Sequence, residues 1–298
     1  MKATELKSRL DSPQPPALLH VLPQDVFEAL RIKGSLNACV YEMAFAGKVA
    51  DLLPDKSAPV VVYGAGDGSQ DARVAAEILR GLGHESVEEF AGGLKEWREA
   101  GLPLEGHGAL PGGDLPADGE YRVDTEASII RWTGRNLFNH HSGTVKLSGG
   151  QLNLADGLVT SADFSIDMRS IACEDLADAQ YSSLLLRHLA NADFFDTEKH
   201  PEAKFVAHSC EPVQGAAPGS PNFRLSGTFT LRGVTRPLTF PLVAANAGDG
   251  RIAGQALIDL DRTEFGSIYG SGRFFRFLGQ HVVNDIVHLH VNIHAVKA

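Results

Sequence analysis

The spacing of apolar residues divides the chain into two parts. In the first part, short apolar runs alternate with helical patterns. Residues 18–22 and 60–63 have the continuous apolar run of a buried strand. Residues 73–82 and 94–100 have the spacing of helices, and Gly101 ends the second one. This alternation predicts an α/β fold in which helices cover a parallel sheet.

The second part of the chain has a period of two. Apolar and polar residues occupy alternate positions, as in antiparallel strands that bury one face. Several such strands must close into a barrel or stack as a sandwich. One helical pattern, at about residues 176–189, interrupts them. The alternation is clearest in residues 164–168, 223–231, 238–242 and 287–293.

A stretch rich in glycine and proline separates the two parts. Residues 101–119 read GLPLEGHGALPGGDLPADG and have no periodicity, which is typical of a linker. We therefore expect an α/β domain at residues 1–105, a linker at 106–118 and an all-β domain at 119–298.

Charge, hydropathy and cysteine content argue against a nucleic-acid binder, an exported protein and a membrane-spanning protein. Residues 1–105 contain 11 basic and 16 acidic residues, and residues 106–298 contain 16 and 21, so neither part has the basic excess of a nucleic-acid binder. The N-terminal residues do not resemble a signal peptide, and no segment approaches the ~20 consecutive apolar residues of a membrane span. Three distant cysteines without a C-x-x-C pair, Cys39, Cys173 and Cys210, indicate reduced thiols and a cytoplasmic protein.

A glycine-rich turn, Gly64–Ser69, follows the second predicted strand. It lacks the G-x-G-x-x-G spacing of a dinucleotide site, because Ser69 stands where the third glycine is needed. The flanking sequence is more informative. Residues 33–38 (KGSLNA) and 90–103 (FAGGLKEWREAGLP) resemble the rhodanese family, and the resemblance covers about residues 17–105.

The rhodanese resemblance implies a sulfur-carrying loop that has lost its nucleophile. Active members have a cysteine directly after this strand, and N–H groups at a helix N-terminus stabilise its persulfide. Here Gly64 occupies that position, Asp67 adds negative charge to the loop, and His20-Val21-Leu22 replaces the family's Asp-x-Arg. We therefore expect a catalytically silent domain. A sulfurtransferase that uses Cys39 is the enzymatic alternative.

Four stretches in the all-β part carry a second resemblance. They are residues 136–145, 187–205 (RHLANADFFDTEKHPEAKF), 226–240 (SGTFTLRGVTRPLTF) and 261–266 (DRTEFG). In this order they resemble the YceI-like family over about residues 120–298. The resemblance implies a lipocalin-like antiparallel barrel, with one helix, that binds an isoprenoid lipid.

The alternation indicates which side chains face the barrel interior. A small closed barrel holds either packed side chains or one elongated apolar ligand, and periodicity alone leaves both open. The family resemblance favours a ligand cavity. Its candidate mouth is Arg273-Phe274-Phe275-Arg276, with a solvated charged loop as the alternative. The expected lipid-binding residues are Trp132, Phe164, Ile166, Met168, Phe229, Leu231, Phe240, Leu289, Phe274 and Phe275.

Histidines occur in several segments that the fold could bring together. None has the i, i+4 or similar short spacing that makes a metal motif strong. We therefore expect no metal, and a metal-dependent activity remains an alternative. The histidines concerned are His140, His141, His188 and His281, with Asp193 and Asp285 nearby in sequence, whereas His288, His290 and His294 lie opposite the apolar face of their strand.

The resulting hypothesis is a two-domain binding protein. Its barrel binds or carries a polyprenyl or quinone-like lipid, and its silent rhodanese-like module acts as a sensor or interaction domain. No catalytic residue, other cofactor or nucleic-acid partner is expected. The sequence leaves the ligand's identity and the oligomeric state open, a homo-oligomer included.

Overall fold

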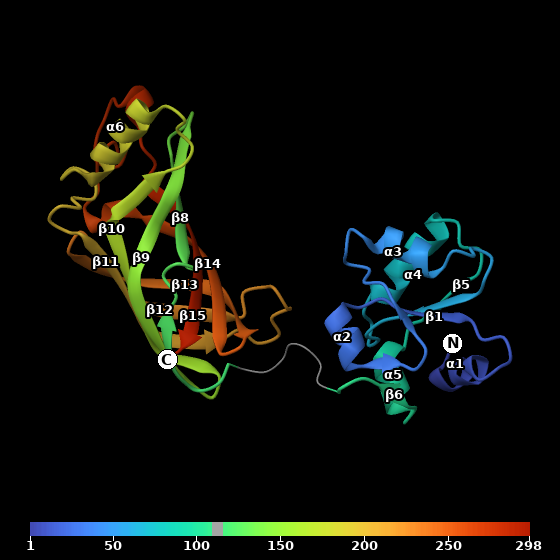
Figure 1. Cartoon of the computed structure of the whole chain (residues 1–298). Helices are drawn as coiled ribbons and strands as arrows, with labels where there is room; N and C mark the ends of the chain where they lie inside the picture. The colour runs from blue at the N-terminus through green and yellow to red at the C-terminus, as the bar shows by residue number, and fades with distance from the viewer. Residues whose placement is uncertain (109–115) are drawn as a thin grey trace. The chain divides into compact units, whose positions relative to one another are not determined.

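The computed structural model describes residues 1–108 and 116–298. The chain separates into two compact units, Met1–Gly113 and Asp114–Ala298 (Figure 1). Most of the predicted linker at 106–118 lies outside the described residues.

The N-terminal unit is a parallel sheet with helices on both faces, as the α/β pattern predicted (Figure 1). Its strands lie in the order β3-β1-β4-β5. In β4 (Val60–Tyr63), Val60 and Val62 pack toward α3 and α4, whereas Val61 and Tyr63 pack toward α1 and α5. Burial on both faces explains the continuous apolar run. The other elements are α1 (Ala3–Leu10), β1 (Ala17–His20), α2 (Gln24–Ala29), β3 (Leu36–Asn37), α3 (Phe45–Leu52), α4 (Asp71–Gly81), β5 (Val87–Phe90), α5 (Gly93–Glu99) and the pair β2 (Arg31–Ile32) and β6 (Leu104–Glu105).

The C-terminal unit is a closed antiparallel barrel, which confirms the all-β prediction. β10 pairs with both β9 and β11, and β15 pairs with both β14 and β8, so the described strands form a ring. β7 and β8 share one place in the ring, because each pairs with a different end of β15 and β9. The strands are β7 (Gly119–Val123), β8 (Ile129–Arg135), β9 (His140–Ala155), β10 (Leu158–Cys173), β11 (Glu202–Pro212), β12 (Phe223–Leu231), β13 (Val234–Gly248), β14 (Arg251–Asp261) and β15 (Ile286–Lys297).

One end of the barrel carries the helical elements of this unit: α6 (Ala179–Ala190), η1 (Arg262–Phe265) and η2 (Gly279–His281). Figure 1 shows α6 there, and the C-terminus at the other end. Among the described helices, none combines the length and hydropathy that a bilayer crossing requires, and α6 has only 12 residues.

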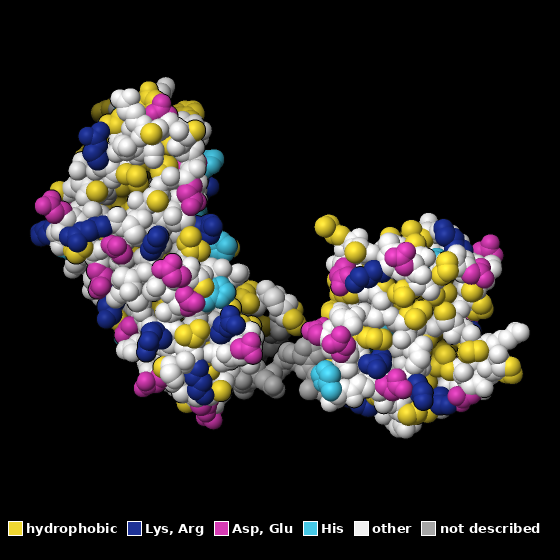
Figure 2. Space-filling model, in the orientation of Figure 1, with side chains coloured by type: hydrophobic (Ala, Val, Ile, Leu, Met, Phe, Trp, Pro, Cys, Tyr) yellow, Lys and Arg dark blue, Asp and Glu magenta, His cyan; other side chains and the backbone are white. Residues whose placement is uncertain are grey.

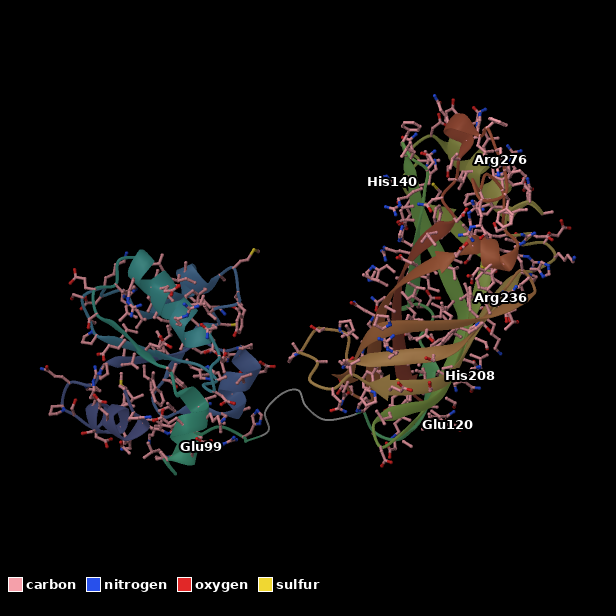
Figure 3. All side chains as sticks on the ribbon, turned by 180° about the vertical axis from the view of Figure 1, so that it is seen from behind. Glu99, Glu120, His140, His208, Arg236 and Arg276 are labelled. Carbon is pink, nitrogen blue, oxygen red and sulfur yellow. The ribbon has the colours of Figure 1, made fainter. Side chains whose placement is uncertain are left out.

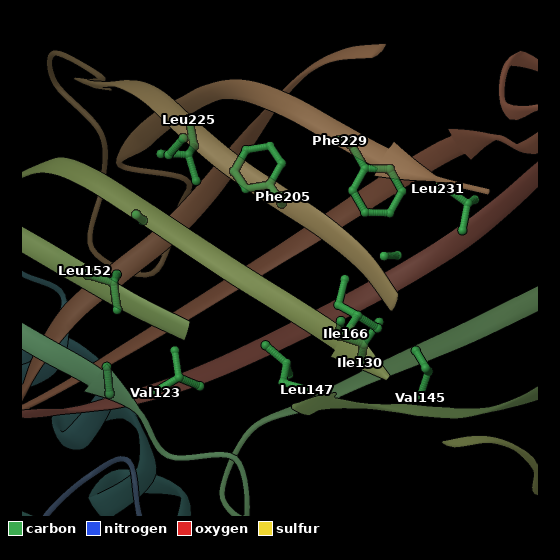
Figure 4. Packing of buried hydrophobic residues seen from close by; sticks show 14 of the residues in the cluster. Val123, Ile130, Val145, Leu147, Leu152, Ile166, Phe205, Leu225, Phe229 and Leu231 are labelled. Carbon is green, nitrogen blue, oxygen red and sulfur yellow. The ribbon is translucent and has the colours of Figure 1, made fainter. Parts of the chain in front are cut away.

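The alternating apolar residues of the strands form the inner face of the barrel, and Gly227 leaves space for the ring of Phe205. Figure 4 shows the inward side chains of neighbouring strands turned toward one another. A Cβ at Gly227 would overlap the carbonyl oxygen of Val206 and lie 2.7 Å from Cζ of Phe205. The Phe205 ring therefore requires glycine on the next strand.

Candidate functional site: the barrel interior and the glycine loop

The barrel interior is a single apolar cluster. The Phe205 ring connects an aromatic row, with its centroid 6.4 Å from that of Phe164 and 5.4 Å from that of Phe240. None of the described members of the cluster carries a charge or an amide. A guest molecule in this space would therefore meet hydrocarbon and aromatic surface.

Most side chains in this cluster keep a small accessible surface, whereas most side chains in the core of the N-terminal unit keep almost none. Ile166 and Met168 are each 8 % exposed and Phe229 is 7 % exposed, whereas Leu19 and Leu79 are 0 % exposed. A close-packed interior leaves almost no surface that a water-sized sphere can touch. This residual exposure is what a barrel interior incompletely filled by its own side chains would leave.

Two glycines on the inner face, Gly134 and Gly254, also have unfilled space beside them. A Cβ added at Gly254 would meet nothing closer than the Val243 carbonyl oxygen, at 3.8 Å. A Cβ added at Gly134 would meet only the Trp132 ring, at 4.0 Å. These are ordinary van der Waals distances, so a Cβ would fit at these two positions.

The structure brings the eight predicted barrel residues together on the inner face. Seven belong to the main cluster or pack against it, and Trp132 forms an adjoining cluster with Leu189 and Phe194 beneath α6. Phe274 and Phe275 lie outside both clusters and are 51 % and 43 % exposed. The seven are Phe164, Ile166, Met168, Phe229, Leu231, Phe240 and Leu289.

Sequence reasoning missed Phe205, the centre of the aromatic row. It alternates with Ala203 and Ala207 on β11, and all three are buried. That alternation was present in the sequence, but alanine gives a weak apolar signal.

Trp132 presents an apolar face to the interior. Its indole N–H donates to the carbonyl oxygens of Thr144 and Ala172, at 3.3 and 3.2 Å. Because the one polar atom of the ring is already bonded, the rest of the indole is available for apolar contact.

Helix α6 packs loosely over this end of the barrel. Asp178 caps its N-terminus by accepting from the backbone N–H groups of Gln180 and Tyr181. Of its twelve residues, Leu189 alone is buried. The helix therefore depends on few apolar contacts, which is typical of segments that open at low free-energy cost.

Arg262 fixes the chain segment between β14 and β15. The side chain is fully buried and donates to the carbonyl oxygens of Ser267, Val283 and Asn284. Its guanidinium also lies 5.1 Å from the centroid of the Phe194 ring. Burial lowers the pKa of Arg262, and the nearby Asp285 and Asp261 oppose that shift. The arginine of the D-R-x-x-F-G motif is thus an internal anchor.

The predicted mouth loop is divided between bound and exposed groups. Arg273 pairs with Asp261 at 3.1 Å and with Asp285 at 3.6 Å. Arg276 is exposed and has no ion-pair partner within the described ranges. One of the two predicted cations is therefore held by carboxylates, and the other faces solvent.

Two of the four histidines of the predicted cluster pair with carboxylates, and no ion pair in the described part of the chain involves His140 or His281. Nδ1 of His141 lies 3.0 Å from Asp175, and His188 lies 3.9 Å from Asp193. In residues 1–108 and 116–298, no three His, Cys, Asp or Glu side chains gather as metal ligands. Burial would raise the pKa of Asp175, but hydrogen bonds from the Ser142 backbone, His141 and Cys173 lower it to about 2. These pairs thus join segments at the α6 end of the barrel.

The glycine loop of the N-terminal unit already holds an anion, the carboxylate of Asp71. This buried group accepts from the backbone N–H of Ala65 at 3.1 Å and from the hydroxyl of Ser69 at 2.7 Å. A Cβ added at Gly64 would overlap it. The space into which a side chain at Gly64 would project is therefore filled, and sequence reasoning missed Asp71.

Cys39, the thiol of the enzymatic alternative, is 3 % exposed and is a free cysteine. His20 ends β1 and is fully buried against the rings of Phe27 and Tyr63. Burial lowers the pKa of His20 to about 4, which Asp71 opposes and Arg31 assists. His20 is thus a neutral core residue at neutral pH.

Comparison with known families follows the division into two units. A YceI-like domain model matches residues 121–295, more than half of the chain. The chain belongs to the YceI-like family. A rhodanese-like domain model matches residues 2–100, so both resemblances seen in the sequence are confirmed. The YceI-like match spans the barrel, and the rhodanese-like match spans the parallel sheet.

Individual relatives of the YceI-like part are distant. A UPF0312 protein of Pseudomonas putida is 29% identical over 136 residues, which are 44% of this chain and 64% of the relative, so the chain spans less than two thirds of that relative's length. BcnA of Burkholderia cenocepacia is 23% identical with a TM-score of 0.46, covering 58% of this chain and 99% of its own. A polyisoprenoid binding domain from Saccharophagus degradans, implicated in plant cell wall breakdown, is 16% identical with a TM-score of 0.44, covering 62% and 100%.

Proposed function

We propose that the barrel binds and carries one elongated apolar ligand of the isoprenoid class, polyprenyl or quinone-like. The observation that carries this proposal is the residual exposure of inward-facing apolar side chains such as Ile166, Met168 and Phe229. Membership of the YceI-like family supports the ligand class, since the resemblance implies isoprenoid binding.

The energetics favour a long hydrocarbon chain. Burial of apolar surface contributes about 25 cal/mol per Å², so about 300 Å² of prenyl chain would contribute several kcal/mol against the cost of immobilisation. The interior cluster offers no charged partner among its described members. A polar headgroup would therefore stay at the α6 end, near exposed Phe274, Phe275 and Arg276.

Entry beneath α6 suits this arrangement. At the opposite end, Tyr121 is 1 % exposed and donates its hydroxyl to the Ala117 carbonyl, and Ala295 is 2 % exposed, so these inward-facing residues are closely packed. At the α6 end the cover is a helix with one buried residue, Leu189. Displacing the helix would cost few apolar contacts and would open the space beside Trp132.

We propose that the rhodanese-like module is catalytically silent and serves as a sensor or interaction domain. The Asp71 carboxylate within the glycine loop supports this assignment, because a second anion such as a persulfide would meet like charge there. A cytoplasmic location and a homo-oligomer stay predictions.

A substitution that fills the barrel tests the carrier proposal. Gly254→Phe places a ring on the inner face, at a position where a Cβ meets no atom closer than 3.8 Å, and Gln255→Phe places the same ring on the exposed outer face one residue away. We expect wild-type protein and Gln255→Phe to bind a fluorescent geranylgeranyl probe. Gly254→Phe should bind it about tenfold more weakly or worse, because the ring occupies ligand space.

Native mass spectrometry of the full chain gives the second readout. A bound prenyl mass should be present in wild-type protein and reduced in Gly254→Phe. A wild-type barrel that always emerges empty and rejects added prenyl lipids would overturn the proposal.

A further inference from the structure

Exposed apolar side chains gather at the α6 end of the barrel. In the described part of the C-terminal unit, twelve large apolar side chains are exposed, and nine of them lie in residues 137–138, 181–184 and 269–282. We call these nine the apolar rim. Figure 2 shows hydrophobic side chains at this end of the barrel unit.

The three segments of the apolar rim are fixed next to one another. The ring centroids of His188 on α6 and Tyr269 lie 4.4 Å apart. The backbone N–H of Asn284 donates to the carbonyl of Arg135, the last residue of β8. Figure 3 likewise places His140 and Arg276 at one end of the barrel and Glu120 at the other. The rim is therefore one surface around the end of the barrel that α6 covers.

Its most exposed members project from turns. Leu137 and Phe138 are 84 % and 68 % exposed in the β8–β9 turn, and Phe277 is fully exposed. Phe277 also has φ of 60°, in the left-handed region that a bulky residue rarely occupies. Separate protruding rings fit a deformable surface better than the flat, complementary surface of a protein partner.

One segment of the rim, residues 267–284, differs in charge from the chain as a whole. Residues 267–284 contain Arg273 and Arg276 and no carboxylate, in a chain of net charge −10. Because Arg273 is held by Asp261 and Asp285, Arg276 is the arginine of this segment that has no ion-pair partner among the described residues. Aromatic rings beside arginine match the lipid–water interface, where rings sit at the depth of the phosphates and arginine pairs with them.

We propose that the apolar rim docks on a lipid bilayer, with Phe274, Phe275 and Phe277 in the interface and Arg276 at the phosphates. The purpose of this contact rests on the proposed function: a prenyl lipid would pass between bilayer and barrel without crossing water. The contact itself requires no ligand in the barrel.

Vesicle flotation of the full chain tests the proposal. The probes are phosphatidylcholine vesicles with and without phosphatidylglycerol, both free of prenyl lipid. We expect wild-type protein to float with the vesicles, and the double variant Phe274→Ser, Phe277→Ser to bind about tenfold less or worse, since two rings leave the interface. Leu257→Ser removes an equally exposed apolar residue, 74 % exposed on the barrel wall, and should bind like wild type.

Further variants separate the alternatives. Arg276→Gln should weaken binding mainly to vesicles that contain phosphatidylglycerol, and Gly254→Phe should float like wild type, because filling the barrel leaves the rim intact. Wild-type protein that stays in solution with both vesicles overturns the docking proposal and leaves the carrier proposal untouched. A dimer that the double Phe variant converts to monomer, without vesicle binding, would show that the rim contacts a second copy, which also overturns it.

Discussion

At the scale of single residues, the Asp71 carboxylate can occupy its place in the glycine loop only because residue 64 is a glycine. The carboxylate is satisfied by the Ala65 N–H and the Ser69 hydroxyl, and it occupies the place where a Cβ at Gly64 would project. The loss of the nucleophile could be predicted from the sequence, because it depends only on which residue occupies position 64. The replacement anion was not, because its position depends on how the loop folds over the start of α4.

This pairing predicts how the loop responds to a restored thiol. Gly64→Cys alone should destabilise the N-terminal unit by about 1–3 kcal/mol through overpacking against Asp71, with no sulfur transfer from thiosulfate to cyanide. Adding Asp71→Ser should recover most of that stability and free the Ala65 N–H for a sulfur anion. Chemical denaturation and thiocyanate release measure the two effects.

Gly68→Cys is the matched control for the restored thiol. It places a thiol in the same loop where no atom lies within 4 Å, away from the Asp71 site, although the left-handed φ of 80° adds strain. It should show no transfer with or without Asp71→Ser. A single Gly64→Cys variant as stable as wild type would contradict the account.

At the scale of elements, α6 differs from the strands it covers. The strands are joined to neighbours on both sides, whereas α6 is held by a capped N-terminus, one buried leucine, and the contacts of the partly buried Leu185 and His188. The sequence pattern predicted this helix at about 176–189, and the structure has it at Ala179–Ala190. Its weak packing could not be predicted, because the run Leu184-Leu185-Leu186 suggests full burial, whereas Leu184 is exposed and the other two leucines are only partly buried.

Loss of the cap should therefore loosen α6 selectively. Asp178→Ala removes the acceptor for Gln180 and Tyr181 and should cost about 1 kcal/mol of helix stability, or about fivefold faster amide exchange in α6. Hydrogen exchange with mass spectrometry would measure it. Ser183→Ala, at an exposed position of the same helix, should not accelerate exchange. Equal acceleration in β9 and β10 would instead show that α6 and the barrel open together.

At the scale of the whole molecule, the change of period at the linker predicted both fold classes. Closure into a barrel was beyond periodicity, because the same alternation serves a sandwich. The pairing of β9 with β10 and of β15 with β8 decides between them. Alternation identifies which residues share a face of a strand, so the inner-face residues could be predicted. It does not tell whether that face lines a closed barrel or the space between two sheets, so closure could not be predicted.

The two units should also differ in their response to acid. Burial lowers the pKa of His20 from 6.5 to about 4. Between those values the unfolded chain binds a proton that the folded unit does not, so the N-terminal unit should lose about 3 kcal/mol of stability as pH falls from ~6.5 to ~4. Asp175 in the barrel acts with the same sign in a lower pH window: its pKa of about 2 contributes stability that is present above ~4 and is lost only as pH falls toward 2.

Each unit contains one tryptophan, Trp97 and Trp132, so fluorescence can follow them separately. In denaturant unfolding at pH 7 and pH 5, Trp132→Phe should report a weakened N-terminal unit at pH 5. Trp97→Phe should report a barrel in which the contribution of Asp175 is intact. His20→Asn should flatten the pH dependence of the first signal, because a buried amide takes up no proton in this range. A Trp97 signal with the same midpoint at both pH values would show that His20 is not neutral through burial, and its contacts with Phe27 and Tyr63 would then need another explanation.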